Sequence, residues 1–155
     1  MRMENKIRPT INTEGVGQSR YETYKATIDR IDKAIDAGFY VEAIALCESI
    51  IADRLESLAN QISQSSKYSY ETMGKLTDYL SGVKQRTLLT QEIVSVVNEI
   101  KDWIKKRNSA VHEMAKNIEG TFMEKYTNLK ETAEEAIKLF RKLDNEIRKF
   151  RKSLN

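Results

Sequence analysis

The sequence has one cysteine, one proline and six glycines among its 155 residues. Scarce proline and glycine leave long stretches free of helix breakers, and no run alternates polar and apolar residues with a period of two. The single thiol, Cys47, cannot form an internal disulfide, and its apolar neighbours predict a small buried side chain rather than a nucleophile. These absences favour an all-α domain in a reducing compartment.

The sequence also lacks a long apolar run. Spanning a bilayer takes roughly 18–20 apolar residues, and no stretch approaches that length. The first 18 residues are polar and lack the apolar core of a signal peptide. We therefore predict a cytoplasmic protein. Its net charge of +3 is too small to diagnose nucleic-acid binding.

Apolar residues recur at steps of three and four along five segments, which is the spacing of an amphipathic helix. Residues 1–18 lack this periodicity and are predicted to form a flexible N-terminal arm, followed by a single helical domain over residues 19–155. Ser19-Arg20-Tyr21-Glu22 fits a capping box and predicts the start of the first helix, which Gly38 ends. Further helices are predicted over about 39–61, near 70–80, from about Thr90 onward and from Thr121 onward.

The last segment begins with a second capping box, Thr121-Phe122-Met123-Glu124, and keeps its apolar stripe as far as Leu154. A helix of this length would extend for about 50 Å at about 1.5 Å per residue, which is longer than a small bundle needs. Its end is therefore expected either to project from the bundle or to pack on another chain. The predicted fold is an all-α, up-and-down bundle of about five helices with a long C-terminal helix.

The only histidine ends the stretch Arg107-Asn108-Ser109-Ala110-Val111-His112, at the end of the fourth segment. This stretch resembles the Arg-x4-6-His motif of HEPN domains, in which a polar residue often follows the arginine. The preceding run Trp103–Lys106 and the segment Phe39–Leu58 are similar to helices of that family. The resemblance covers residues 20–150 in layout and is specific over about thirty residues.

The resemblance implies a metal-independent endoribonuclease without a cofactor, with Arg107 and His112 as its catalytic residues. It also implies a homodimer, in which Arg and His of both copies line one cleft, and a role as a toxin or phage-defence component. A nucleotidyltransferase-like antitoxin is a possible partner. In such pairs the antitoxin often attaches nucleotides to a tyrosine two places after the histidine. This chain has Met114 there, so the resemblance does not extend to that mode of silencing.

The residue types fit RNA strand cleavage. A histidine is suited to proton transfer near neutral pH, and an arginine offers a planar charged fork for phosphate oxygens. The 2′-hydroxyl would attack the adjacent phosphorus while His112 moves the proton and Arg107 stabilises the developing charge. Such chemistry needs no metal, and the sequence lacks a His/Cys ligand cluster. Residues predicted to support the site or bind phosphate are Asn108, Ser109, Lys105 and Lys106.

Helix geometry leaves two arrangements open. In an unbroken helix Arg107 and His112 would point about 140° apart, so they could not face one substrate from the same helix. The helix could break at Asn108-Ser109, two good N-cap residues, which would place His112 in a first turn that favours anions. Alternatively, a second copy supplies the missing partner across a two-fold axis, as the resemblance implies. The two arrangements are compatible.

Two other functions remain open. One is a catalytically inactive HEPN-like module that binds nucleotide, RNA or a partner protein. The other is a helical adaptor that uses residues 122–154 as a coiled-coil arm. Trp103 is predicted to be a core or interface residue rather than a base-stacking platform. Glu48, Asp53 and Arg54 lie on the second helix, but no spacing argument links them to the motif.

Overall fold

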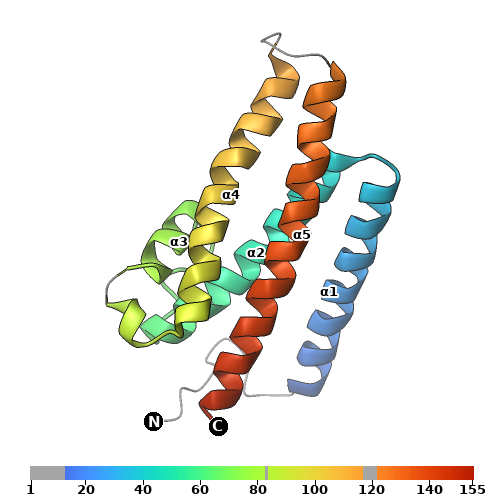
Figure 1. Cartoon of the computed structure of the whole chain (residues 1–155). Coiled ribbons are helices and arrows are strands. Elements are labelled where there is room, and N and C mark those ends of the chain that lie inside the picture. Colours follow the sequence, from blue (N-terminus) through green and yellow to red (C-terminus); the bar gives the residue numbers. More distant parts are fainter. Residues whose placement is uncertain (1–12, 83, 117–121) are drawn as a thin grey trace.

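The computed structural model describes residues 13–82, 84–116 and 122–155 (Figure 1). Within these ranges the elements are α1 (Thr13–Asp36), α2 (Tyr40–Ser63), α3 (Met73–Leu80), a 3-10 turn (Gln85–Thr87), α4 (Gln91–Ala115) and α5 (Phe122–Ser153). The described residues contain no strand, so the predicted all-α bundle of about five helices with a long C-terminal helix is confirmed. In the same ranges, no helix is long and apolar enough to cross a membrane.

α1 begins earlier than predicted. It includes residues 13–18, which were assigned to the N-terminal arm, so Ser19 lies inside the helix and the predicted capping box is wrong. The Ser19 carbonyl oxygen accepts a hydrogen bond from the Thr23 hydroxyl at 2.8 Å, one helical turn along the chain. Each residue that extends an existing helix adds one backbone hydrogen bond. A residue with good N-cap character, such as Ser19, can therefore lie inside a helix that begins before it. Residues 1–12 of the predicted arm, and Thr121, the predicted cap of α5, lie outside the described residues.

The turn between α1 and α2 depends on Gly38, which follows the end of α1 as predicted. Gly38 has φ +81°, a conformation that L side chains rarely adopt. Its carbonyl oxygen accepts a hydrogen bond from the Tyr126 hydroxyl of α5 at 2.7 Å. A Cβ atom on Gly38 would overlap this hydroxyl. The glycine therefore permits both the turn and its close contact with α5.

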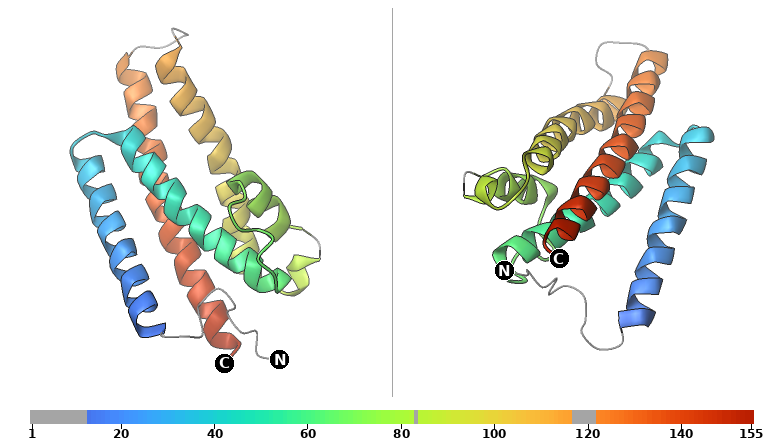
Figure 2. Two further views of the ribbon diagram at one scale, coloured as in Figure 1. Left: turned by 180° about the vertical axis from the view of Figure 1, so that it is seen from behind. Right: turned by 60° about the horizontal axis from the view of Figure 1, so that its bottom comes forward.

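α2 and α5 form the centre of the bundle. α2 packs against α1, α3 and α5, while α5 packs against α4, α2 and α1. Seen from behind, α2 crosses obliquely over α5 (Figure 2). The central position predicted for α2 is confirmed by burial of its whole predicted apolar set: Tyr40, Ala43, Ile44, Cys47, Ile50, Ile51, Leu55, Leu58 and Ile62.

The long α5 helix buries its apolar stripe inside the same chain. Its buried apolar residues include Leu129, Ala133, Ile137, Phe140, Leu143, Ile147 and Phe150. The part that projects is the beginning of α5, which extends past the α1–α2 turn beside the end of α4 (Figure 1). There Phe122 and Met123 remain largely exposed. The fold thus places the Arg107–His112 stretch at one projecting end of the bundle.

Candidate functional site

The helix that carries the motif is unbroken. The Thr90 hydroxyl caps α4 by accepting from the Ile93 N–H at 3.3 Å, and the helix continues to Ala115. A break at Asn108-Ser109, one of the two arrangements that the sequence left open, therefore does not occur. Placing these two residues in a helix interior costs roughly 0.5–0.7 kcal/mol each. Buried Ala110 and the partly buried side chains that follow it continue the apolar stripe, and their burial offsets this cost.

His112 consequently lies in the last turn of α4 rather than in the first turn of a new helix. The C-terminal end of a helix carries a partial negative charge, which favours cations and disfavours anions. The anion-favouring first turn that a break would have given His112 is thus also absent. Attraction of a phosphate to this region has to come from cationic side chains.

Arg107 and His112 lie on different faces of α4, about 140° apart. Arg107 continues the buried stripe, in line with Trp103 and Ala110, and is only partly exposed. His112 is exposed, as are Asn108 and Ser109. Within one chain, the two predicted catalytic residues are therefore not brought together.

Arg107 forms an ion pair with Glu48 of α2, through its Nε atom and the Glu48 Oε1 atom. Solvent does not reach either atom, and the two side chains are 29% and 26% exposed. Burial raises the pKa of Glu48, and the positive charge of Arg107 opposes that rise. Among the described residues, the terminal guanidinium nitrogens of Arg107 have no hydrogen-bond partner. The pair therefore fixes the guanidinium while its outer nitrogens stay available.

The sequence contained a signal for this pair that the motif did not use. Glu48 falls between Ile44 and Ile51 at steps of four and three, on the edge of the apolar stripe of α2. Arg107 likewise occupies a position in the apolar stripe of α4, between Trp103 and Ala110 at steps of four and three. A charge that is placed toward a core needs a partner of opposite sign, and each stripe holds one.

The lysines predicted to bind phosphate differ from each other. Lys106 pairs with Glu135 of α5, with its Nζ atom 3.3 Å from Oε1. Lys105 is exposed and has no ion-pair partner among the described residues. The two side chains lie about 100° apart round the helix. Only Lys105 extends the exposed face that carries Ser109 and His112.

Trp103 is a core residue, as predicted. Its side chain is 0% exposed, and its Nε1–H donates to the carbonyl oxygen of Thr132 in α5 at 2.9 Å. This bond joins the two helices that project at the motif end. The indole ring cannot stack on a base without leaving the core.

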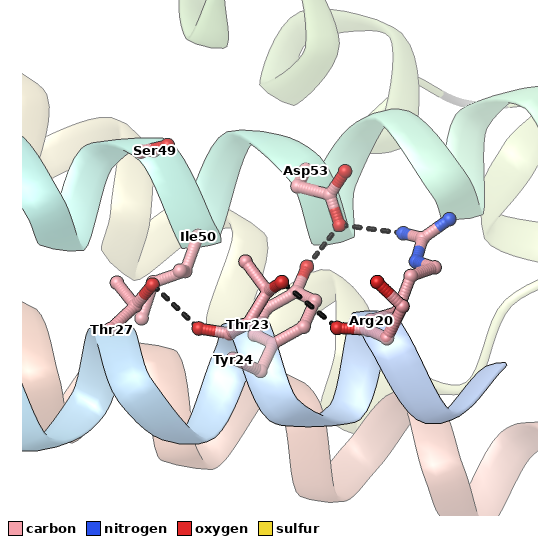
Figure 3. A pocket seen from close by; sticks show the side chains of 8 residues that line it. Arg20, Thr23, Tyr24, Thr27, Ser49, Ile50 and Asp53 are labelled. Carbon is pink, nitrogen blue, oxygen red and sulfur yellow. Dashed lines mark hydrogen bonds and ion pairs between the residues drawn. The ribbon is translucent and has the colours of Figure 1, made fainter. Parts of the chain in front are cut away.

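Asp53 and Arg54, the other charged residues noted on α2, belong to a different surface. Asp53 accepts hydrogen bonds from Arg20, at 2.8 Å, and from the Tyr24 hydroxyl of α1, beside a pocket of about 370 Å³ (Figure 3). Arg54 pairs with Asp144 of α5 at 2.6 Å and lies 5.0 Å from the centre of the Tyr24 ring. Burial, and then the bond to Asp53, raises the pKa of Tyr24. These contacts join α1, α2 and α5 and do not involve Arg107.

In the part of the chain that the structure describes, no three His, Cys, Asp or Glu side chains are grouped so as to hold a metal ion. No protein-family model, curated protein or solved structure matches this chain. The HEPN resemblance therefore stays a prediction that rests on the motif and its helical setting.

Substitution of Arg107 by alanine is expected to raise the pKa of Glu48 further, because it removes the positive charge that opposes the effect of burial. The Glu48 carboxyl carbon followed by 13C NMR through a pH titration would measure this. Since folding raises this pKa, stability falls as pH rises from about 4.3, the ordinary value for glutamate, through the folded pKa. That fall should be larger in Arg107→Ala. Lys106→Ala is the matched control, because Lys106 pairs with Glu135 and should leave Glu48 unchanged. An unchanged Glu48 pKa in Arg107→Ala would show that the pair does not form.

Proposed function

We propose that the chain is a HEPN-type, metal-independent endoribonuclease that acts as a homodimer. The observation that carries the proposal is the placement of Arg107 and His112 on one unbroken helix, about 140° apart, with Arg107 held by Glu48. One chain alone does not present both groups to one phosphate. A second copy related by a two-fold axis would present the His112 of one copy beside the Arg107 of the other.

The position of the motif in the fold supports this arrangement. The end of α4 extends past the α1–α2 turn together with the start of α5 (Figure 1). Another copy can therefore approach the end of α4, and to reach Arg107 it would also lie against α2 near Glu48. In the proposed dimer, the ends of the two α4 helices meet, and both Arg107 and both His112 side chains face one cleft.

The chemistry needs one proton carrier and one charge stabiliser. The 2′-oxygen of a ribose forms a bond to the adjacent phosphorus while the bond from phosphorus to the 5′-oxygen breaks. His112 takes the proton of the 2′-hydroxyl and passes it to the departing 5′-oxygen, which leaves as a 5′-hydroxyl. The outer guanidinium nitrogens of Arg107 stabilise the charge on the phosphoryl oxygens, while Nε stays bound to Glu48. The products are a 2′,3′-cyclic phosphate and a free 5′-hydroxyl.

The biological role proposed is that of a toxin or phage-defence component, and a nucleotidyltransferase-like antitoxin is the proposed partner. Both come from the resemblance of the motif. The adaptor alternative finds less support, because the apolar stripe of α5 from Leu129 to Phe150 packs inside the chain. A coiled-coil arm would have to release that stripe from its own core.

The test is cleavage of mixed single-stranded and transfer RNA by the purified protein in excess EDTA. The native chain is expected to leave 2′,3′-cyclic phosphate ends. Arg107→Ala and His112→Ala should each reduce the rate by about 10²–10⁴-fold, the usual contribution of such groups. Lys106→Ala serves as the control, because this lysine is paired with Glu135 away from His112. Equal activity in all four chains would indicate a contaminant. Intact dimers that cut neither RNA would favour the inactive binding module.

A further inference from the structure

The exposed face of α4 carries a row of groups that the motif does not include. Lys105, Ser109 and His112 follow one another at steps of four and three, and all three are exposed. Lys116, the C-cap residue of α4, is exposed one turn beyond His112. We refer to these four residues as the α4 stripe. Because α4 is unbroken, His112 lies in the same line as Lys105.

The two lysines of the α4 stripe differ from the other lysines of this helix. Lys101 pairs with Asp78 at 3.0 Å, and Lys106 pairs with Glu135 at 3.3 Å. Over the described residues, the ammonium groups of Lys105 and Lys116 have no such partner. The stripe therefore presents two uncompensated positive charges, one on each side of His112.

Two acidic residues limit the stripe. Asp102 is exposed one turn before Lys105, and half-buried Glu113 lies one turn from both Ser109 and Lys116. Glu113 therefore stands beside the stripe, between Lys105 and Lys116. An anionic chain along the stripe would meet carboxylate repulsion where it passes Asp102 and where it passes Glu113.

The spacing of the stripe suits a nucleic-acid backbone. At about 1.5 Å per residue, Lys105 and Lys116 are separated by about 16 Å along the helix axis, with His112 about 6 Å from Lys116. A stacked strand carries one phosphate per about 3.4 Å, so about five stacked nucleotides cover this length, and an unstacked strand covers it with fewer. Two phosphates held by the lysines would leave several linkages between them, one of which would lie opposite His112.

We infer that a single strand of RNA lies along the α4 stripe, with Lys105 and Lys116 binding phosphates on either side of the linkage at His112. This inference rests on the proposed function, since it places the substrate on the proposed catalytic histidine. A single strand fits better than a duplex, because the 2′-oxygen must turn into line with the bond that breaks. Stacking in a helix holds it away from that alignment.

The test measures binding apart from cleavage. Native protein and its variants are titrated with fluorescent 2′-O-methyl oligouridines of three and eight nucleotides, whose blocked hydroxyl prevents strand cleavage. Each phosphate contact contributes a slope of about −0.7 in log K against log salt for single strands. Lys105→Ala and Lys116→Ala should each reduce the slope for the octamer by about 0.7 and weaken binding about fivefold at 0.1 M salt. The trimer cannot reach both lysines, so each substitution should affect it less.

Lys106→Ala is the matched control, one residue from Lys105 and expected to leave the slope unchanged because its charge is already paired. Asp102→Asn should tighten binding of the octamer about twofold by removing an exposed carboxylate one turn from Lys105. The inference is overturned if Lys106→Ala lowers the slope as much as Lys105→Ala, or if no chain binds the octamer at 0.05 M salt. It is also overturned if a duplex of equal length binds more tightly through the same two lysines.

The two proposals fail in different ways. Binding that depends on the two lysines, without RNA cleavage, would support RNA binding along the α4 stripe and contradict the proposed ribonuclease activity. Cleavage that yields cyclic phosphates, with RNA binding unchanged by substitution of Lys105 or Lys116, would support the proposed ribonuclease activity and contradict RNA binding along the α4 stripe.

Discussion

Mixing Arg107→Ala chains with His112→Ala chains is expected to restore RNA cleavage to about a quarter of the native level. Random exchange places the two variants together in about half of the dimers. Each mixed dimer then has one intact pair, an Arg107 from one copy and a His112 from the other. Because these residues lie about 140° apart on one helix, the pair that works should be the one formed between copies. Against variants that have each lost about 10²–10⁴-fold in rate, such a recovery would be large.

The control replaces the His112→Ala chain with a chain that carries both substitutions. In a mixture of this chain with Arg107→Ala, no dimer contains Arg107, so cleavage should stay at the level of the single variants. Subunit exchange is verified by recovering an untagged chain on a tagged one. If exchange occurs and the first mixture remains inactive, Arg107 and His112 act within one chain, and the shared site is wrong.

Substitution of Trp103 by alanine is expected to reduce the free energy of unfolding by about 3–5 kcal/mol. The ring is 0% exposed and is the largest fully buried side chain of the described residues. Its loss leaves a cavity between α4 and α5 and removes the hydrogen bond to the Thr132 carbonyl oxygen. Urea denaturation followed by circular dichroism would measure the change.

Trp103→Phe separates packing from hydrogen bonding at the same position. It keeps an aromatic ring in the core and loses the indole N–H, so a smaller reduction of about 1–2 kcal/mol is expected. Both variants should bind the octamer with native affinity at temperatures where they remain folded. A Trp103→Phe chain of native stability that binds the octamer weakly would mean that the indole touches RNA.

Periodicity was sufficient to predict the helices because the apolar stripe of each one is local in sequence. The stripe from Ile93 to Trp103 predicts α4, and every side chain of that stripe is buried as expected for a core face. Gly38 predicts the end of α1 because its backbone conformation is itself a local property. Such features need no knowledge of what the helix packs against.

Helix ends were less predictable. Ser19 has the residue type and spacing of a cap, yet α1 begins at Thr13. Asn108 and Ser109 favour a break, yet α4 continues to Ala115. In both places the preference of a few residues amounts to about 1 kcal/mol. In α4, burial of the apolar side chains after Ser109, which are Ala110 and the partly buried residues that follow it, contributes more than that.

The sequence by itself determined that this protein is helical, and it marked out Arg107 and His112 through the motif. Only the tertiary structure decided that Arg107 points into the bundle onto Glu48 while His112 faces outward beside Lys105. Glu48 and Arg107 are 59 positions apart in the chain, so no local spacing joins them. They meet because α2 and α4 each turn their apolar stripe to one core, and opposite charges at the edges of two such stripes are stable only when they pair.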